Sequence, residues 1–483
     1  MMKRITTIRQ FLRSVSLFAA LFLIQNSIAQ TTSGCWKSFS SGELFSLAIT
    51  SNGQLWSWGY NNFAQLGLGT QSNSSKSTKS LIGTDSDWKV VDAGSEYGMA
   101  IKDNGTLWGW GANFSGMLGD GTGETRKSPV QIGADANWSK ISAGVLNTLA
   151  LKSDGTLWAW GRNNEGQLGD GTNTIRAVPT QIGIDTDWTE ITTGERHCLA
   201  IKTDGTLWAW GSNGNGQLGL ADNLFSDKNI PTQVVTATNW KVISAGRNFT
   251  LAIKNDGTLW SWGQNDFGQL GNGFSFGSSD VPNQIGADTD WASIATGDIH
   301  SMALKTNGTR WAWGSNGNDS NSSGSAGALG DTTKTDKNIP TKIGTDNDWK
   351  KPQAGDYFSF CMKNDGTLWS NGRNTAGELG DGTAVARLFP TLVSCPISLT
   401  TSVFNDEIPG LEIYPNPVKD ILWIKNSDDL YIDRISVFDI SGKHILTKDD
   451  NSSQINLEGI ENGIYLLQIF SEGKSYRKKI IKE

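Results

Sequence analysis

Short, largely apolar runs with a period of two, in which large residues alternate with small ones, recur along the chain. In a representative stretch, the run Leu149–Lys152 is followed by Asp154 and Gly155 and then by a second run, Leu157–Trp160. Such runs are too short for helices, and an Asp-Gly or Asn-Gly step between two of them favours a two-residue hairpin turn with positive φ at both positions. The pattern therefore predicts β-hairpins.

This hairpin pattern occurs seven times, at intervals of 50 to 58 residues. The longest interval contains an insertion rich in Ser, Asn and Gly, Ser315–Ala326. A sheet of about 50 residues cannot bury its own faces, so neighbouring repeats must stack. A closed ring of such sheets protects their edges, and we expect a seven-bladed β-propeller. One glycine after Ala, Ser or Thr marks each repeat, and these marker glycines are Gly42, Gly94, Gly144, Gly194, Gly246, Gly297 and Gly355.

Tryptophan has the same period as the repeat. Of the 21 tryptophans, 20 occupy repeat positions, most of them in a Trp-x-Trp motif that places both rings on one strand face. A row of tryptophans can stack on sugars, but regular repetition at strand positions is more typical of a core. Each buried ring removes about 150–250 Å² from water. We therefore expect these rings to pack the propeller.

Composition excludes several classes of protein. Glycine accounts for 57 of the 483 residues and charged residues for 18%. These values exclude a coiled coil, a collagen helix and charge-driven disorder. The net charge of −7 argues against a nucleic-acid partner, which needs a basic surface. We expect a monomer.

Residues 1–29 have the pattern of a secretory signal peptide. Basic residues, among them Lys3 and Arg4, precede the apolar run Val15–Ile24, and Ser27–Ala29 is a small-residue cleavage site. The alternative is a membrane anchor, but a run of ten apolar residues is too short for a bilayer core of about 30 Å. The sequence predicts a mature chain that begins at Gln30 and has no transmembrane segment.

Residues 411–483 differ from the repeats, with fewer glycines, more isoleucines and alternating runs that predict a small β-sandwich. Four motifs stand in order: Tyr414–Val418, Asp439–Lys443, Asn462–Tyr465 and Lys478–Ile481. Together they resemble the immunoglobulin-like C-terminal sorting domain of the type IX secretion system. The resemblance implies export across the outer membrane of a two-membrane bacterium, removal of the domain in or near a linker at residues 398–410, and a product that is released or attached to the cell surface.

The repeat carries a second resemblance. The segment Asp154–Gly161 (DGTLWAWG), followed by Gly166–Gly169 (GQLG), resembles the regulator-of-chromosome-condensation repeat, and the likeness extends over about residues 34–397. The resemblance implies a seven-bladed propeller, and we assign residues 30–397 to it. The family's best-known activity, nucleotide exchange on the small GTPase Ran, is contradicted here by the two export signals.

The four cysteines support ring closure. When the repeats are bent into a circle, the arm that ends at Val393 meets Trp36, which sets Cys35 beside Cys395. We expect a disulfide there, and closing a loop of about 360 residues contributes about 5 kcal/mol in the chain-entropy description. Cys198 and Cys361 are expected to be free and buried. Without a C-x-x-C pair and with three histidines in the whole chain, we expect no metal and no cofactor.

Lysine ends the second strand of six repeats. We expect the flanking acidic residues to neutralise this ring of charge. The six residues are Lys102, Lys152, Lys202, Lys254, Lys305 and Lys363.

The three positions after each marker glycine vary while their surroundings repeat. A strand-linking loop that recurs in every repeat lines one face of the ring, and loops on a rigid scaffold concentrate binding residues. The other interpretation is that the third residue packs against the next blade and the rest is solvated. The candidate ligand-binding residues are Glu195, Arg196, His197, Arg247, Asn248, Asp298, His300, Asp356 and Tyr357.

The sequence thus favours a secreted or surface-attached binding propeller. Its expected partners are the type IX secretion machinery, through residues 411–483, and an extracellular protein or glycan. One alternative is a carbohydrate-active enzyme, although no pair of carboxylates stands out and no catalytic residue is named. The others are an adhesin or coat protein, and an inhibitor, because secreted propellers of this repeat type can inhibit β-lactamases.

Overall fold

The computed structural model of the protein describes residues 34–221, 224–317, 327–396, 411–426, 431–439, 444–448, 453–471 and 474–483. The predicted signal peptide, residues 1–29, and the predicted linker, residues 398–410, lie outside the described residues. In the described ranges the chain forms strands and turns without a helix, which confirms the all-β fold class. No helix that could cross a membrane is therefore found in these ranges.

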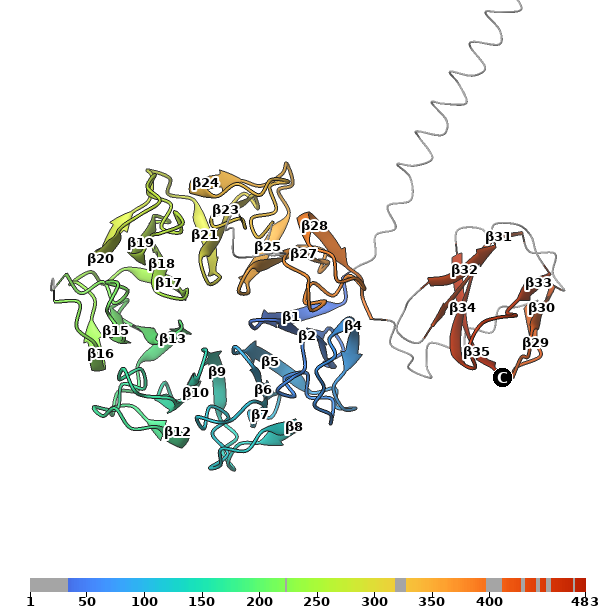
Figure 1. The fold of residues 1–483 in the computed structure, drawn as a ribbon, viewed down its shortest axis with the longest axis horizontal. Coiled ribbons are helices and arrows are strands. Elements are labelled where there is room, and N and C mark those ends of the chain that lie inside the picture. Colours follow the sequence, from blue (N-terminus) through green and yellow to red (C-terminus); the bar gives the residue numbers. More distant parts are fainter. Residues whose placement is uncertain are drawn as a thin grey trace, which may run out of the picture. The chain divides into compact units, whose positions relative to one another are not determined.

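Seven antiparallel sheets of four strands each form a ring (Figure 1). Within each sheet the strands lie side by side in chain order, so each sequence repeat makes one blade. In Figure 1 the first strand of each blade lies toward the centre of the ring and the fourth lies at its outside. The seven-bladed β-propeller is confirmed.

The strands of the blades have the following bounds. Blade 1 has β1 (Trp36–Ser41), β2 (Phe45–Thr50), β3 (Leu55–Gly59) and β4 (Lys76–Leu81); blade 2 has β5 (Trp88–Ala93), β6 (Tyr97–Lys102), β7 (Leu107–Gly111) and β8 (Arg126–Gln131); blade 3 has β9 (Trp138–Ala143), β10 (Asn147–Lys152), β11 (Leu157–Gly161) and β12 (Arg176–Gln181). Blade 4 has β13 (Trp188–Thr193), β14 (His197–Lys202), β15 (Leu207–Gly211) and β16 (Lys228–Gln233); blade 5 has β17 (Trp240–Ala245), β18 (Phe249–Lys254), β19 (Leu259–Gln264) and β20 (Ser278–Gln284). Blade 6 has β21 (Trp291–Thr296), β22 (His300–Lys305), β23 (Arg310–Gly314) and β24 (Lys337–Lys342); blade 7 has β25 (Trp349–Ala354), β26 (Phe358–Lys363), β27 (Leu368–Gly372) and β28 (Arg387–Val393).

The hairpin between the second and third strands differs from the expected two-residue turn. In blade 3, Lys152 N–H donates to Thr156 O at 3.1 Å, so three residues form the loop. Positive φ is confined to Gly155, at 78°, and does not include Asp154. Asp154 Oδ1 instead accepts hydrogen bonds from the N–H and the hydroxyl of Thr156, at 3.0 and 2.7 Å. The Asp-Gly step therefore closes a three-residue hairpin that ends in a glycine bulge.

The tryptophans form the core between blades, as predicted. The second ring of each Trp-x-Trp motif is fully buried, and its indole N–H donates to a backbone carbonyl of the preceding blade. Trp210 Nε1, for example, donates to Gln167 O at 3.0 Å. The same contact joins blade 1 to blade 7, because Trp58 Nε1 donates to Glu378 O at 2.8 Å. A repeated hydrogen bond thus fixes the spacing of the blades and also closes the ring.

Polar side chains on the inner strands protect the free edge of each neighbouring blade. Ser40 Oγ accepts a hydrogen bond from Ala93 N–H at 3.1 Å, and Asp92 Oδ2 accepts one from Ala143 N–H at 2.8 Å. Ser142 Oγ accepts from Thr193 N–H at 3.0 Å in the same way. Because an unpaired edge N–H can template pairing with another chain, these contacts favour a closed, discrete ring.

The seam between blades 7 and 1 carries the predicted disulfide. Cys35 and Cys395 are bonded, with their Cα atoms 5.9 Å apart. Beside them Trp36 Nε1 donates to Val393 O at 3.3 Å, so the arm meets Trp36 as expected. Cys198 and Cys361 are free and buried, which was also predicted.

Each lysine that ends a second strand lies in a cage of two tryptophans. Lys102 Nζ lies 4.8 Å from the ring centres of both Trp88 and Trp108 and pairs with Asp85 at 2.7 Å and Asp87 at 3.1 Å. Acidic partners also neutralise Lys152, Lys202, Lys305 and Lys363. Lys254 is the exception: Ala237 and Asn239 replace the two aspartates, and burial lowers the pKa of this lysine.

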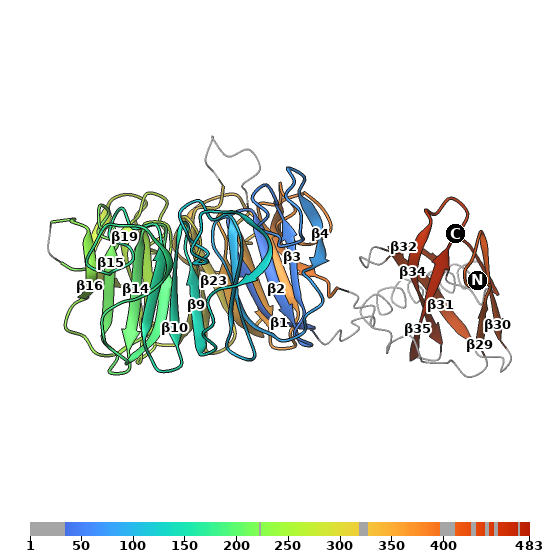
Figure 2. The same cartoon turned by 90° about the horizontal axis from the view of Figure 1, so that it is seen from below.

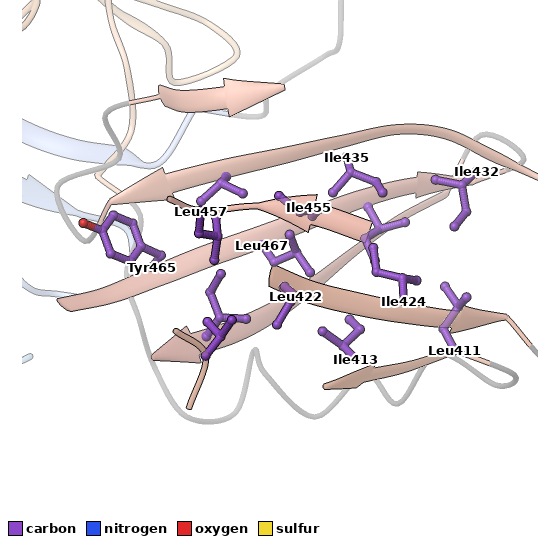
Figure 3. Packing of buried hydrophobic residues seen from close by; sticks show 14 residues of the cluster. Leu411, Ile413, Leu422, Ile424, Ile432, Ile435, Ile455, Leu457, Tyr465 and Leu467 are labelled. Carbon is purple, nitrogen blue, oxygen red and sulfur yellow. The ribbon is translucent and has the colours of Figure 1, made fainter. Parts of the chain in front are cut away.

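The C-terminal residues form two antiparallel sheets with one shared core. The first contains β29 (Leu411–Tyr414), β30 (Ile421–Asn426) and β33 (Gln454–Asn456); the second contains β31 (Ile432–Asp439), β32 (His444–Lys448), β34 (Gly463–Ser471) and β35 (Lys474–Lys482). Figure 3 shows the buried aliphatic side chains of both sheets directed toward one another. Asn416 ties the first sorting motif to the last, because its Nδ2 donates to Lys479 O at 2.9 Å and its Oδ1 accepts from Ile481 N–H at 2.8 Å.

Candidate functional site

The loop between the first and second strands lies at the same face of the ring in every blade. Since all blades are antiparallel sheets with the same strand order, their first turns emerge together. Figure 2 shows the ring from the side, with loops gathered at its two faces. We call these seven loops the mouth loops; they are residues 42–44, 94–96, 144–146, 194–196, 246–248, 297–299 and 355–357.

The marker glycines allow the mouth loops to pack. A Cβ atom at Gly246 would overlap the ring of Phe249, and one at Gly194 would overlap the ring of His197. A Cβ at Gly194 would also collide with the carbonyl oxygen of Gly246 in the next blade. Glycine therefore recurs because the third residue after it folds back underneath the loop.

The third residue after each marker glycine is buried between blades. His197 and His300 are both 0% exposed, so neither is accessible to a ligand at the mouth. The Nε2 atom of His197 lies 3.2 Å from Thr250 Oγ1, and that of His300 lies 2.9 Å from Ser359 Oγ, each in the next blade. Burial lowers the pKa of both histidines to about 3. These two candidates act as neutral packing residues.

The first residue after each marker glycine lines a central cavity. The cavity has a volume of about 540 Å³ and takes its lining from all seven blades. Backbone hydrogen bonds run around it: Glu195 N–H donates to Arg247 O, and Arg247 N–H donates to Asp298 O, both at 3.3 Å. The first-position residues are Glu43, Ser95, Val145, Glu195, Arg247, Asp298 and Asp356.

Two guanidinium groups organise the acids of the cavity. Arg247 donates to Glu195 at 2.8 Å and lies 3.5 Å from Asp298. Arg373 pairs with Asp356 and with Glu378, both at 3.0 Å. Each arginine thus bridges two carboxylates.

Tyr357 stacks at this side of the cavity. Its ring centre lies 5.2 Å from the Arg373 guanidinium carbon. The sequence pattern did not indicate Arg373, because it follows β27 and lies outside the mouth loops. The signal that could have found it is the residue after the Trp-Gly step of each repeat, which is Asn371-Gly372 in blade 7, because this residue also varies among the repeats.

Burial and like charge perturb two carboxyl groups. Burial raises the pKa of Asp298 well above its usual value, and the neighbouring Asp356 carboxyl group raises it further. In the mouth loop of blade 2, burial and the nearby Glu43 raise the pKa of Glu96 to about 7. In both cases burial is the main cause, and a second carboxyl group nearby adds to it.

The two remaining candidates lie at the rim. Arg196 is exposed and pairs with Glu195 at 3.1 Å and Glu165 at 3.5 Å. Asn248 Nδ2 donates to Gln264 Oε1 at 3.2 Å. The structure therefore brings Glu195, Arg247, Asp298, Asp356 and Tyr357 together around the cavity, with Arg196 and Asn248 outside it.

No group of three or more His, Cys, Asp and Glu side chains in the described part of the chain is arranged to hold a metal ion. The charged side chains that line the cavity are carboxylates and guanidinium groups.

Comparisons with known proteins agree with this architecture. The family model of the RCC1-like domain matches residues 23–243 and 136–406. That of the secretion system C-terminal sorting domain matches residues 412–483.

Curated relatives share the repeat over part of their length. The chain is 30% identical over 363 residues to the ultraviolet-B receptor UVR8 of Arabidopsis thaliana, covering 74% of this chain and 57% of the receptor. It is 30% identical over 169 residues to the probable E3 ubiquitin-protein ligase HERC6 of Homo sapiens, covering 34% of this chain and 16% of that protein. The chain thus spans a minor part of the ligase and little more than half of the receptor.

Solved structures share the fold. Yeast RCC1 (Prp20), in its complex with Kap60, has a TM-score of 0.62 at 20% identity and covers 82% of this chain and 92% of its own. Human WBSCR16 has a TM-score of 0.63 at 19% identity and covers 71% of this chain and 94% of its own.

Proposed function

Because the chain belongs to the RCC1-like domain family and ends in a secretion system C-terminal sorting domain, we propose that it is an exported binding propeller. In this proposal residues 1–29 direct export from the cytoplasm, residues 30–397 form the binding module and residues 411–483 engage the type IX secretion machinery. The sorting domain supports a secreted or cell-surface location. The ligand, an extracellular protein or glycan, is held at the mouth loops.

The central cavity carries this proposal. Its wall combines a rigid part and a variable part: the marker glycines repeat in every blade, while the residues that follow them differ in charge and size. A ring fixed by backbone and tryptophan hydrogen bonds presents these variable side chains at one face, which is the arrangement typical of binding sites on rigid scaffolds.

Affinity capture tests the proposal. The mature full chain, immobilised, is exposed to envelope proteins, culture-medium proteins and polysaccharides, beside a variant with Arg196, Arg247, Asn248 and Tyr357 changed to Ala. The control variant changes Asp103 and Lys241, which are exposed at the opposite face, to Ala. We expect a saturable partner that the control retains and the mouth variant loses. A partner that both variants retain would show that the ligand binds outside the mouth loops.

A further inference from the structure

We infer that the central cavity receives a cationic side chain, arginine or lysine, projecting from an extracellular protein partner. This inference rests on the proposed function and gives the ligand a chemical class. It follows from the charge balance of the cavity, from one unsatisfied hydroxyl in its wall and from the small residues that make up the rest of the lining.

The charged lining of the cavity is unbalanced. Its lining contains four carboxyl side chains but two guanidinium groups, those of Arg247 and Arg373. The four carboxylates are Glu43, Glu195, Asp298 and Asp356. A cation that enters the cavity would therefore meet net negative charge in a partly enclosed space, where Coulomb attraction is screened less than at an open surface.

Glu43 is the acid that the arginines leave uncompensated. Its carboxylate accepts a hydrogen bond from the Ser95 hydroxyl at 2.6 Å. Arg373 reaches the same residue but donates to its backbone oxygen. Glu43 is exposed toward the mouth and has Glu96 nearby, so like charge accumulates on this side.

Ser41 supplies a second, independent observation. It lines the cavity, is 7% exposed, and its hydroxyl oxygen has no hydrogen-bond partner among the described residues. The Ser41 hydroxyl oxygen is itself covered, and a rotation of its side chain about χ1 toward the cavity would let it accept a hydrogen bond from a ligand N–H donor. Ser41 directly precedes the loop that carries Glu43, so one donor group can address both residues.

The lining favours an organic cation over a metal ion or a sugar. A metal site needs three or four converging ligands, and no such group occurs in the described residues. Most remaining wall residues are Gly, Ala, Ser and Thr, which leave room for a side chain. The single aromatic residue in the lining, Tyr357, already faces Arg373, so it offers no free stacking platform for a sugar.

Titration calorimetry of the mature full chain tests this inference. The probes are N-acetyl-arginine amide and N-acetyl-lysine amide, with N-acetyl-citrulline amide as the neutral control of the same shape, and calcium chloride as the metal control. We expect the two cations to bind and citrulline amide and calcium not to. Equal binding of citrulline amide, absence of binding by both cations, or tighter binding of calcium would overturn the inference.

Variants locate the site. Glu43→Gln is expected to weaken cation binding by about tenfold, since it removes a charge-assisted contact, and Ser41→Ala by a smaller factor. Asp103→Asn, an acid at the opposite face, is the matched control and is expected to leave binding unchanged. Thermal midpoints of all variants show that they remain folded. Unchanged affinity in folded Glu43→Gln would refute the site.

The capture experiment separates this inference from the proposed function. A protein partner that the mouth variant loses and Glu43→Gln also loses supports both. A partner that only the mouth variant loses keeps the binding propeller and rejects the cationic group in the cavity. A polysaccharide as the captured ligand likewise keeps the propeller's role and rejects this inference.

Discussion

At position 371 the seventh blade has asparagine where the other six have the fully buried tryptophan. Asn371 keeps the hydrogen bond of the missing indole, because its Nδ2 donates to Ala328 O at 2.8 Å. Arg310 replaces the leucine of the other repeats, is completely buried, and donates to Asn371 Oδ1 at 2.7 Å. Its Nε and Nη1 atoms have no hydrogen-bond partner among the residues that the structure describes. Two substitutions in neighbouring blades thus form one compensating pair.

Changing only one member of this pair should destabilise the propeller. Asn371→Leu removes the amide oxygen that accepts a hydrogen bond from the buried Arg310 guanidinium, and we expect the free energy of unfolding to fall by about 2 kcal/mol or more. The double variant Arg310→Leu with Asn371→Trp restores the pattern of the other blades, so we expect its thermal midpoint to exceed that of Asn371→Leu. Unfolding followed by tryptophan fluorescence measures both. A double variant that is less stable than the single one would show that the two sites are not coupled.

Two carboxyl groups of the mouth loops predict the direction of a pH dependence. The pKa of Glu96 is raised to about 7 and that of Asp298 is also raised, so the folded state favours their protonated forms. Their contribution to stability is present at low pH and is lost as pH rises through these raised values. The pKa of Arg247 is raised, so this guanidinium stays charged, and the mouth loops become more negative with rising pH.

Cation binding should therefore strengthen between pH 5 and pH 8. Calorimetry with N-acetyl-arginine amide measures the affinity across this range, and we expect about a tenfold increase, which corresponds to about one carboxyl group losing its proton. Glu96→Gln is the control, because it should flatten the part of the profile near pH 7. A profile that falls with pH would contradict the charge argument.

At the scale of single elements, the hairpin between the second and third strands ends in a repeated lysine cage. Lys202 and Lys254 form a natural comparison. Lys202 lies over Trp188 and Trp208 and pairs with two aspartates, at 2.7 and 3.2 Å. Lys254 has an equivalent pair of rings, with its Nζ 4.7 and 3.7 Å from the ring centres, but Ala237 and Asn239 stand in place of the acids.

Replacing each lysine by methionine should separate ion pairing from ring packing. Lys202→Met leaves two aspartates close together without their cation, and we expect a loss of about 1 kcal/mol. Lys254→Met removes a partly buried charge that has no ion pair in the described structure, and we expect little or no loss. Thermal unfolding at low salt and in 1 M NaCl checks this, because salt should shrink the effect of Lys202→Met only. Equal losses in both variants would mean that the tryptophan contacts dominate.

At the scale of the whole molecule, the repeat made the architecture predictable, while the site was predictable only in part. Marker glycines, Trp-x-Trp motifs and the positions of Cys35 and Cys395 are each constrained by backbone geometry, so their spacing reveals blades and seam. Variation between repeats is less specific. Phe249 and His197 fill equivalent buried spaces beneath their glycines, so differences there reflect interchangeable packing rather than exposure.

The first position after each glycine differs from the third because it lines the central cavity, whereas the third is buried between blades. Only the folded ring shows that these side chains converge on one cavity, since they lie about 50 residues apart in sequence. Arg373 was missed for the same reason: it enters the cavity from another loop of blade 7. The sequence repeat identifies the residues that build the blades. Only the folded ring shows which of the variable side chains meet at the central cavity and can act together.

The ring is closed between blades 7 and 1 by a disulfide and by hydrogen bonds, and the two contributions can be separated by experiment. The disulfide between Cys35 and Cys395 spans 360 residues, and removing it should cost about 5 kcal/mol in the chain-entropy description. The Trp58 contact to Glu378 closes the same seam and remains when the disulfide is reduced.

We therefore expect the Cys35→Ser, Cys395→Ser variant to fold into the same ring but to unfold at a clearly lower temperature than the oxidised chain. The reductant dithiothreitol should lower the midpoint of the parent chain and leave that of the variant unchanged. Cys198→Ser is the control for loss of a thiol elsewhere. An equal midpoint for the parent chain and the double-serine variant would show that hydrogen bonds between blades 7 and 1 suffice to hold the ring closed.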